Sequence, residues 1–397
     1  MSTERYQVVV VGAGLVGAAA ALALGRQGLR VALIERQAPT APQEKWDTRV
    51  YAIGPPSQRF LAQIGAWDRM ERERIQPVFR MDVAGDVRGA VRLDAYESGV
   101  PQLATIVENG RLQNALWRAL EADGNVALHC PAAIAVLSTS GSHTSLQLDD
   151  GSTLETELVV GADGAHSSIR AWAGLASVTT PYDRHGVVAN FECERPHRGT
   201  AFQWFFDGDA LAWLPLSAGT RSTGVQTVRN CLSIVWSTRP DHAKSLLALD
   251  ASAFADTVQR AGRHQLGRLQ LLTPAAAFPL QLQRVLSSVA PGVVLIGDAA
   301  HGVHPLAGQG VNLGFGDAEV LVDVLAAQHR RTPCGDVRLL KAYARQRAEP
   351  VMKMQALTHG LHHLFADARA GWLRNMGMQC VDRLPPLKAA LVREAMS

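Results

Sequence analysis

The spacing of apolar and polar residues changes along the chain, and the changes mark its organisation. Four consecutive valines end the stretch from Tyr6 to Val11 and indicate a buried strand, while the alanine-rich stretch from Leu15 to Gln27 predicts a helix. Arg30 to Ile34 predicts a second strand. Far along the chain, Val293 to Ile296 is another buried run, and Val311 to Gln328 has the apolar spacing of a long helix. Both regions are typical of an α/β fold.

The middle of the chain has the pattern of a sheet instead. Short alternating stretches occur from Ile75 to Leu93 and again between residues 176 and 285, with one predicted helix from Ala251 to Ala261. Several short strands with a covering helix indicate a second, sheet-rich domain. The strands predicted in the longer segment are Gly186 to Phe191, Thr200 to Phe206, Ala210 to Leu216, Thr223 to Val228 and Leu232 to Trp236.

Further helices follow from apolar spacing and from capping residues. Ser57 to Ile64 is typical of a capped helix, Glu108 to Leu120 has leucines on one face, and Asp336 is placed to cap a helix from Val337 to Ala348. An apolar stripe then recurs at helical spacing and either packs on the first domain or meets a membrane or a partner, which the pattern leaves open. The stripe consists of Met354, Leu357, Leu361, Leu364 and Phe365.

The length of the chain supports the two-domain interpretation. With 397 residues it is too long for one small core. An apolar content of 47% marks a folded globular protein. The expected division places residues 1–75, 100–175 and 285–397 in a discontinuous first domain and residues 76–99 and 176–284 in the sheet-rich domain.

Charge and cysteine usage exclude other classes of function. The 39 basic and 36 acidic residues give a net charge of +3, whereas a nucleic-acid-binding protein needs a concentrated basic face. No nucleic-acid partner is expected. The five cysteines, at 130, 193, 231, 334 and 380, form no CxxC pair and no cluster at metal-ligand spacing, which indicates reduced thiols and no metal site.

Neither an export signal nor a membrane span is expected near the N-terminus. Val8 to Val11 is too short for the apolar region of a signal peptide and leads directly into a glycine turn. The apolar run from Leu15 to Leu24 is interrupted by Gly17 and is too short to cross a bilayer. A cytoplasmic location is therefore expected.

The glycine-rich turn after the first strand carries the pattern of a dinucleotide site. Gly12 makes the tight turn, Gly14 admits a pyrophosphate, and Gly17 lets the helix and strand pack closely. Glu35 lies eighteen residues beyond Gly17, at the end of the second strand, where it can accept a ribose hydroxyl; Arg36 beside it is included among the cofactor-binding residues. A carboxylate here disfavours NADP, but the turn alone does not separate FAD from NAD.

A second glycine-rich motif spans residues 297 to 319 and joins a predicted strand to a predicted helix. Asp298 can accept a hydrogen bond from a ribityl or ribose hydroxyl, and Pro305 stiffens the loop. Gly308 and Gly310 let the backbone approach a flat ligand. The helix that begins near Val311 directs free N–H groups and the positive end of its dipole at that ligand. This arrangement suits the negative N1/O2 side of a reduced flavin.

The order Gly-Asp-Ala-Ala-His, His-Pro and Gly-Gln-Gly-x-Asn-Leu-Gly in this motif closely resembles the second FAD motif of the p-hydroxybenzoate hydroxylase class of flavoprotein monooxygenases. Within that class the sequence most resembles the ubiquinone-biosynthesis hydroxylases, over nearly the whole chain. The resemblance implies an α/β (α+β) fold, with a Rossmann-like FAD-binding domain, an inserted sheet-rich substrate domain and a helical C-terminal tail.

The resemblance also implies further cofactor contacts. Arg49, in an Asp-x-Arg stretch, matches an arginine that lies against the flavin or its pyrophosphate, or else is an ordinary surface arginine. The family holds the FAD phosphates with an arginine or glutamine in the helix after residue 108; Arg111 is the expected residue, with a merely solvated arginine as the alternative. Asp163 and Gly164 match the family's Asp-Gly motif, and Asn312 belongs to the second FAD motif.

The implied reaction is ring hydroxylation. One FAD fingerprint without a second nucleotide fingerprint implies that NADH or NADPH binds only transiently. Reduced flavin then reacts with O₂ to a C4a-hydroperoxide, which transfers one oxygen to the ring of a polyprenylated phenol. His301 and His304 are close enough in sequence to assist proton transfer, although a structural role is favoured. His304 and Pro305 are the flavin-facing residues expected in the catalytic region.

Other interpretations remain open at this point. The substrate could be a small soluble phenolic compound, the chain could be a flavin-dependent reductase or halogenase, or it could be a flavin-binding subunit without turnover. The resemblance also leaves open an association with a membrane surface, at the inner membrane face, or with a ubiquinone-biosynthesis complex. Four aromatic residues could flank the substrate ring, most of them being expected in the core: Phe202, Trp204, Trp213 and Trp236.

Overall fold

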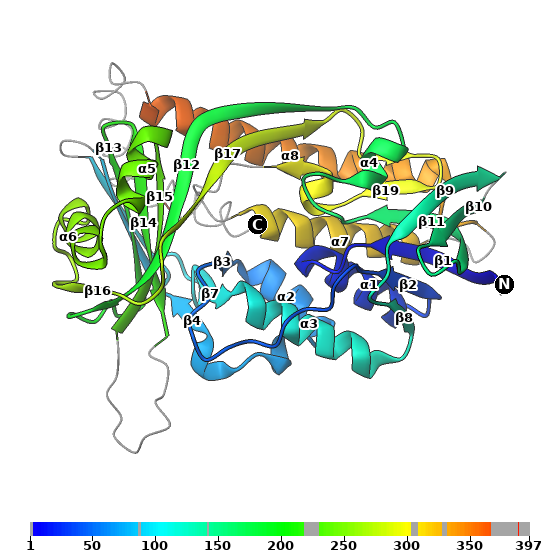
Figure 1. Ribbon diagram of the computed structural model, residues 1–397, viewed down its shortest axis with the longest axis horizontal. Coiled ribbons are helices and arrows are strands. Elements are labelled where there is room, and N and C mark those ends of the chain that lie inside the picture. The colour runs from blue at the N-terminus through cyan, green and yellow to red at the C-terminus, as the bar shows by residue number, and fades with distance from the viewer. Residues whose placement is uncertain are drawn as a thin grey trace.

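The computed structural model describes residues 3–85, 89–140, 143–217, 230–302, 309–327 and 332–366, together with Lys388. The described strands form three sheets. Figure 1 shows a parallel sheet with long helices at one end of the molecule and a nine-stranded sheet standing at the other. The mixed α/β fold expected from the sequence is confirmed.

The parallel sheet is built around the first strand. β1 (Thr3–Val11) lies between β2 (Val31–Ile34) and β11 (Thr153–Gly161), and β19 (Val293–Leu295) pairs with β11, all in parallel. The carboxyl ends of β1, β11 and β19 therefore meet at one edge, with Val11 opposite Gly161 and Gly161 opposite Leu295. The remaining strands of this sheet are β8 (Val126–His129), β9 (Ile134–Ser140), β10 (His143–Leu148) and β18 (Val289–Ala290).

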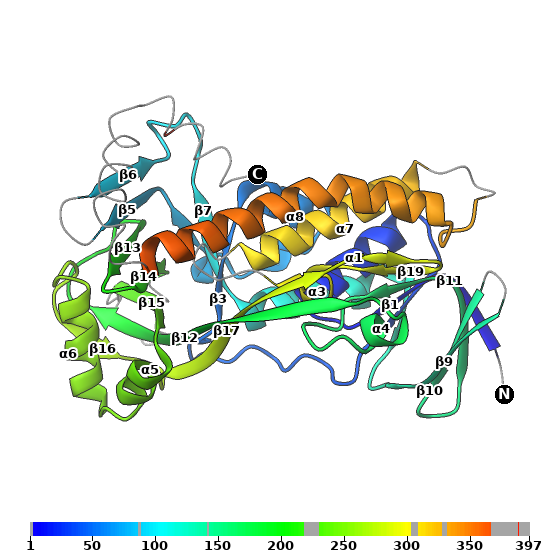
Figure 2. The same ribbon diagram turned by 90° about the horizontal axis from the view of Figure 1, so that it is seen from above.

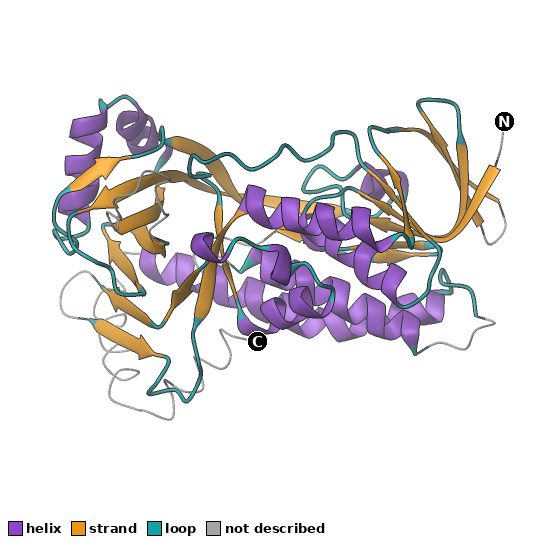
Figure 3. Ribbon diagram, turned by 90° about the horizontal axis from the view of Figure 1, so that it is seen from below, coloured by secondary structure: helices purple, strands orange, loops and turns teal. Residues whose placement is uncertain are grey.

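Long helices cover one face of the parallel sheet (Figure 3). α1 (Leu15–Arg26) buries every residue from Gly17 to Gly25 and packs beside α3 (Asn109–Asp123) and α7 (Gly310–Ala326). Figure 2 shows α8 (Val337–Ala366) lying alongside α7. The main apolar core lies between these helices and the sheet.

The last helix is longer than predicted. The helix expected from Val337 to Ala348 continues through Pro350 to Ala366, so the apolar stripe that follows belongs to the same helix. Proline removes one backbone donor inside a helix, which is why the sequence pattern favours a stop there. The predicted cap is confirmed, because the Arg338 backbone N–H donates to Asp336 Oδ1 at 2.8 Å.

The nine-stranded sheet extends toward the parallel sheet through its two longest strands, β12 (Ser177–Cys193) and β17 (Ala276–Val285), as Figure 1 shows. The predicted strand Thr200 to Phe206 and helix Ala251 to Ala261 are confirmed as β13 and α6, whereas the predicted strand Thr223 to Val228 lies outside the described residues. The other strands are β5 (Arg80–Ala84), β6 (Ala90–Asp94), β14 (Asp209–Leu216), β15 (Asn230–Thr238), β16 (Leu269–Leu271) and β20 (His301–Gly302).

Several elements of this sheet region were not predicted, among them β17, α5 and the short strands β16 and β20. β17 alternates at Phe278, Leu280 and Leu282, but Pro279 within it argues against an ordinary strand. α5 (Pro240–Leu247) has only eight residues, which is too short for its period to stand out. Together α5 and α6 cover an aromatic core that contains Trp204, Trp213 and Trp236.

A small third sheet links the two larger ones. β3 (Val50–Ile53) and β4 (Gln76–Val78) both pair with β7 (Ala104–Glu108), and α2 (Pro55–Gln63) follows β3. The predicted start of this helix at Ser57 was wrong: Gly54 is its N-cap, and prolines occupy the first turn, where a missing N–H costs nothing. The short elements are η1 (Trp67–Arg69), η2 (Arg72–Arg74), α4 (Ser168–Trp172) and η3 (Gly297–Ala299).

The described helices bear on whether the chain crosses a membrane. Within the described ranges, no helix is both long enough and apolar enough to cross a bilayer.

Candidate active site

One large cavity separates the parallel sheet from the nine-stranded sheet. Its volume is about 1210 Å³, which is more than the space taken by a single drug-sized ligand. One side is lined by the first residues of α1 and α7 and by the turns after β11 and β19. The other side is lined by β13, β14, β15 and β17. The first side is called the cofactor side and the second the sheet side.

The glycine turn after β1 has the tight geometry that its residues predict. Gly12 has a positive φ of 100°, and a Cβ there would lie 2.6 Å from the carbonyl oxygen of Ala162. A Cβ on Gly17 would lie 2.0 Å from the carbonyl oxygen of Gly12, so only glycine lets α1 pack on the turn. Gly14 differs, because its Cβ would meet nothing within 4 Å and the residue lines the cavity. A ligand can therefore approach the backbone at Gly14.

The carboxylate at the end of β2 is tied to this turn. Glu35 Oε2 accepts a hydrogen bond of 2.6 Å from the Ala13 backbone N–H, and its Oε1 accepts one of 2.8 Å from the N–H of Arg36. Neither Glu35 nor Arg36 lines the cavity, and the Arg36 side chain is exposed. The pair thus lies beyond the cavity, next to the glycine turn.

The N-terminus of α7 also faces the cavity on the cofactor side. Gln309, Gly310 and Val311 line the cavity together with Asp298 of η3. The first helical hydrogen bond runs from the Leu313 N–H to the carbonyl oxygen of Gln309, so the preceding N–H groups have no carbonyl of their own helix to bind. A negative group in front of this helix would be stabilised by those N–H groups and by the helix dipole.

Asn312 has a different position from its neighbours in the motif. Its Oδ1 accepts from the Gly54 N–H at 2.9 Å, and its Nδ2 donates to the carbonyl oxygen of Ala52 at 2.8 Å. A further contact of 3.2 Å joins Nδ2 to Gln309 Oε1. Asn312 does not line the cavity, so it fastens α7 to β3 and to the start of α2.

The Asp-Gly turn after β11 presents an unsatisfied oxygen. Asp163 Oδ2 accepts hydrogen bonds from the Ser168 N–H at 2.7 Å and the Ser168 hydroxyl at 2.8 Å. Its Oδ1 is buried and has no hydrogen-bond partner among the described residues. Gly164, at a φ of 84°, lines the cavity beside it, and Ser167 caps α4 by accepting from the Arg170 N–H at 2.9 Å. The orphaned Oδ1 has the chemistry to accept a ligand hydroxyl.

Arg49 is at the cavity, held by a short loop. Its backbone N–H donates to Asp47 Oδ1 at 2.9 Å, while Asp47 Oδ2 accepts from the Gly110 N–H at the start of α3. The Arg49 guanidinium lies over the ring of Tyr51, 5.5 Å from its centroid, and both residues line the cavity. Burial raises the pKa of the Tyr51 phenol, with Asp298 acting in the same direction and Arg49 against it, so the hydroxyl stays protonated and can donate.

Arg111 does not line the cavity, so the described geometry does not support its predicted contact with the FAD phosphates. The side chain is only 8% exposed and pairs with Glu108 at 2.9 Å and with Glu71, while its third contact is the carbonyl oxygen of Gln43 at 2.9 Å. It is therefore neither a cavity residue nor a solvated arginine. Its carboxylate partners turn it toward the loop that precedes β3.

Gln113, on the same helix, does line the cavity. It lies one helical turn after Asn109 on α3, and both line the cavity. Its Nε2 donates to the carbonyl oxygen of Ala13 in the glycine turn, at 3.4 Å. The signal in the sequence was the spacing of four residues between Asn109 and Gln113, which places both at the start of the helix face that carries the buried leucines.

His301 takes part in a buried ionic cluster rather than in the cavity lining. Its Nε2 lies 2.6 Å from Asp317 Oδ2, Arg347 Nε donates to Asp317 Oδ1 at 2.7 Å, and the Gly297 N–H donates to Oδ2 at 2.9 Å. Burial alone would raise the pKa of the Asp317 carboxyl, but His301, Arg347 and this N–H lower it overall. These contacts support the structural role favoured for His301.

Three predicted site residues of the second glycine-rich motif lie outside the described residues: His304, Pro305 and Gly308. Their predicted roles stay predictions.

The sheet side is mostly apolar, and much of it consists of small residues. Ala201, Ala210, Ala212, Ala276 and Ala277 line it. Of the four aromatic residues considered for substrate contact, Phe202 lines the cavity, whereas the three tryptophans are buried in the core beneath α5 and α6. The larger apolar residues on this side are Val78, Met81, Leu93, Leu103, Val188, Leu214 and Val235.

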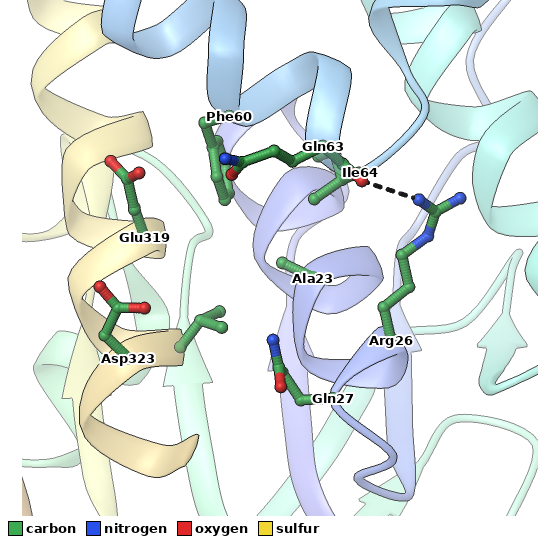
Figure 4. Close-up of a pocket in the computed structure, with 9 residues that line it drawn as sticks. Ala23, Arg26, Gln27, Phe60, Gln63, Ile64, Glu319 and Asp323 are labelled. Atoms are coloured by element: carbon green, nitrogen blue, oxygen red, sulfur yellow. Dashed lines mark hydrogen bonds between the residues drawn. The ribbon is translucent and has the colours of Figure 1, made fainter. Parts of the chain in front are cut away.

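A second pocket, of about 150 Å³, lies between α1, α2 and α7 (Figure 4). Glu319 and Asp323 reach it from α7, and Arg26 reaches it from α1 while donating to the carbonyl oxygen of Gln63 at 3.0 Å. Burial raises the pKa of Glu319, and Asp323 adds to that effect. This pocket is too small for a dinucleotide. Over the described ranges, no group of three or more His, Cys, Asp or Glu side chains is suited to a metal ion.

The cofactor side of the large cavity fits FAD. The open Gly14 position suits a pyrophosphate, the orphaned Asp163 Oδ1 suits a hydroxyl, and the α7 N-terminus suits the anionic edge of a flavin. The sheet side leaves separate space for an apolar molecule.

Comparisons with known proteins agree with this geometry. Residues 5–358 match the family described as FAD binding domain. The chain is 32% identical over 406 residues to 3-demethoxyubiquinol 3-hydroxylase of Escherichia coli (strain K12), with 100% of both chains covered. It is 35% identical over 393 residues to ubiquinone hydroxylase UbiL of Rhodospirillum rubrum, with 98% of this chain and 89% of that one covered.

A solved structure has the same fold. The p-nitrophenol 4-monooxygenase PnpA from Pseudomonas putida DLL-E4 superposes with a TM-score of 0.77 at 18% sequence identity, covering 100% of this chain and 99% of that one.

Proposed function

This chain belongs to the FAD binding domain family, among the ubiquinone-biosynthesis hydroxylases, and from that premise we propose which substrate and residues its reaction uses. It is an FAD-dependent monooxygenase of ubiquinone biosynthesis. The proposed substrate is a polyprenylated phenol, whose ring is hydroxylated with O₂ while NADH or NADPH supplies the electrons. The E. coli relative is named for such a ring hydroxylation.

The observation that supports this substrate most strongly is the character of the sheet side of the cavity. Its described lining contains no lysine, arginine or histidine, and it is dominated by alanine, valine and leucine. A soluble phenolic acid would need a cation to hold its carboxylate, because burying an unpaired charge is costly. A prenyl tail needs only apolar surface, which this side of the cavity provides.

The cofactor residues are proposed from their position at or beside the cavity. Gly12, Gly14 and Gly17 shape the turn for the pyrophosphate, and Glu35 takes the ribose with Arg36 beside it. The remaining members of the proposed set are Arg49, Gln113, Asp163, Gly164, Asp298, Gly310 and Val311, with Asn312 fastening the helix that carries the last two. His304, Pro305 and Gly308 stay predicted members, whereas Arg111 is left out.

The chain's own residues have definite tasks in the proposed reaction. FAD, when bound, supplies the activation of O₂ and the transfer of one oxygen atom to the ring. The α7 N-terminus stabilises negative charge in front of it. Tyr51 keeps its phenolic proton and can donate at the junction of the two sides, and the packed alanines and valines of the sheet exclude water.

The domain division follows the same reasoning. We propose that residues 1–75, 100–175 and 285–397 bind FAD and that residues 76–99 and 176–284 bind the substrate. The cavity between the parallel sheet and the nine-stranded sheet supports this division, because each half of its lining comes mainly from one of them.

A peripheral contact with the inner membrane face, from the cytoplasmic side, is proposed as the route of substrate entry. Exposed residues of α8 include Arg338, Lys341 and Arg345, with Glu349 further along the same face, and then Met352 and Leu357. Exposed basic and apolar residues on one helix suit an anionic bilayer surface. Binding to vesicles with and without anionic lipid would test it, and equal, negligible binding to both would count against it.

The proposed reaction can be tested with purified, FAD-loaded protein. We expect a phenol with a short prenyl chain, in detergent, to stimulate NADPH oxidation and to gain one oxygen atom from ¹⁸O₂ by mass spectrometry. A soluble phenolic acid should give little stimulation. If the acid is hydroxylated and the prenylated phenol is not, the proposed substrate class is wrong; stimulated oxidation without product would point to a reductase.

A further inference from the structure

Two nearly buried polar side chains of the central strands face the sheet side of the cavity and make no hydrogen bond to a described residue. Gln203 of β13 and Ser237 of β15 are each only 6% exposed, and both line the large cavity. Neither side chain makes a hydrogen bond to any described residue, whereas Gln113 and Asn109 on the cofactor side lie beside the glycine turn and Gln113 already donates to it. Buried polar groups are normally paired, and these two are open to a partner within the cavity.

The strand register places both side chains on the same face of the nine-stranded sheet. Gln203 is opposite Ala212, and Ala212 is opposite Val235 on the next strand. Ser237 lies two residues beyond Val235 and is opposite Ala210. Residues two apart on a strand, and residues directly opposite on neighbouring strands, project to the same side. Gln203 and Ser237 therefore project into the cavity from either side of a shared floor.

The floor between them is small and apolar. It consists of Ala210 and Ala212 of β14 with Val235 of β15, all of which line the cavity. Two strand spacings and a two-residue offset separate the Cα atoms of Gln203 and Ser237 by about 12 Å. A flat ring can lie on alanines without steric conflict. The space between the two polar groups is then wide enough for an aromatic ring with an oxygen substituent toward each.

We propose that Gln203 and Ser237 bind oxygen substituents on opposite sides of the substrate ring and so determine the orientation in which the ring meets the cofactor. This inference rests on the proposed function. An amide both donates and accepts, and so does a hydroxyl, so each can serve a phenolic O–H or an ether oxygen. The ligand class is a phenol with at least two ring oxygens, its prenyl chain running along the remaining apolar lining.

The free-energy cost of leaving a buried polar group without a hydrogen bond explains how these two residues discriminate between substrates. A ring without the matching oxygen leaves the Gln203 amide or the Ser237 hydroxyl unpaired after water has been displaced. A site built to hydrogen-bond a substrate group rejects an analogue that lacks it more strongly than an apolar pocket rejects an extra methylene. The pair therefore discriminates between intermediates that differ by one ring oxygen.

The test compares three probes in two variants. The probes are a dioxygenated phenol with a two-isoprene chain and its analogues that lack one ring oxygen each, titrated into the FAD-loaded protein by flavin absorbance. In the unchanged protein the full probe should bind about tenfold more tightly than each analogue. Gln203→Leu should abolish the discrimination for one ring oxygen, and Ser237→Ala should abolish it for the other, while FAD affinity is unchanged.

A matched control uses the same substitution on the same sheet. Gln270 is an exposed residue of β16 that does not line the cavity, so Gln270→Leu should keep the full discrimination. Each variant's unfolding in urea identifies any loss of folding. If Gln203→Leu is unstable, Ser237→Ala, which removes a single hydroxyl, still carries the test.

Failure of this inference is distinguishable from failure of the proposed function. Suppose that the unchanged protein hydroxylates the prenylated phenol, and that both folded variants discriminate between the probes and hydroxylate the same ring position as it does. Gln203 and Ser237 then do not orient the substrate ring. If the unchanged protein neither binds nor hydroxylates any prenylated phenol, the proposed function itself has failed.

Discussion

The two sides of the cavity are built by different physical means. The cofactor side is made of backbone: tight turns at Gly12 and Gly17, the helix start at Gly310, and carboxylates such as Glu35 that hold N–H groups. The sheet side is made of side chains, mostly alanine and valine, that alternate along several strands. A backbone site tolerates no change at a few positions, whereas a side-chain site tolerates many changes and can be adapted to a new substrate.

The largest loss of stability is expected at Gly17, where the packed backbone leaves no space for an added methyl group. The methyl group of Gly17→Ala would lie 2.0 Å from the Gly12 carbonyl oxygen, and we expect a loss of about 3–5 kcal/mol in the free energy of unfolding of the apoprotein. Urea denaturation measures this loss. Gly14→Ala is the control, because its methyl meets nothing within 4 Å. It should leave apoprotein stability unchanged and weaken FAD binding; equal stability losses in the two variants would remove the distinction.

The buried ionic cluster beneath the second glycine-rich motif should show a loss of similar size. Asp317→Asn leaves Arg347 and His301 without their charged partner, and we expect a loss of about 3–5 kcal/mol at neutral pH. The pKa of Asp317 is lower in the folded chain than its ordinary value of 3.8, so its contribution is present above that pH and is lost as the pH falls below it. Denaturation at several pH values should show the difference between the proteins shrinking as the pH falls below about 4. A difference that stayed the same in strong acid would contradict this assignment.

The corrected assignment on α3 predicts opposite results for two nearby residues. Arg111→Leu breaks a buried pair with Glu108 and should destabilise the apoprotein by about 3 kcal/mol. Gln113→Leu should leave the apoprotein's stability nearly unchanged and raise the Kd for FAD about tenfold, because it removes one contact at the cavity. Parallel urea and FAD titrations measure both. The reverse pattern would restore Arg111 as the phosphate ligand.

The smallest change is expected on the sheet side. Ala212→Phe fills the floor of the proposed ring site and should raise the KM for a prenylated phenol about tenfold, while FAD affinity stays unchanged. Steady-state NADPH oxidation measures the first quantity and flavin titration the second. A variant with unchanged KM would show that the ring binds elsewhere in the cavity.

The same contrast explains what the sequence could predict. The glycine turn, the Asp-Gly turn and the start of α7 were identified because their function depends on residue type at fixed spacing along one segment. Arg111 was misplaced because motif position did not say which face of α3 it occupies; its neighbours Glu108 and Glu71 do.

The sheet side was beyond sequence patterns for a physical reason. Gln203 and Ser237 lie on strands 34 residues apart in the chain, and only the pairing through β14 brings them to one face. Their burial and lack of partners appear only in the folded structure. β17 and α5 were missed for a related reason, since tertiary packing rather than local pattern holds them in place.

The central claim concerns the substrate, and the most direct test is a mass spectrum of the quinone extract from a strain that lacks this gene, beside its parent. The proposed function predicts that the mutant accumulates a prenylated phenol short of one ring oxygen. The position of the missing hydroxyl would identify the step. An unchanged quinone pool, in a strain without a second copy of the activity, would contradict a role in ubiquinone biosynthesis and move the substrate to a soluble phenolic compound.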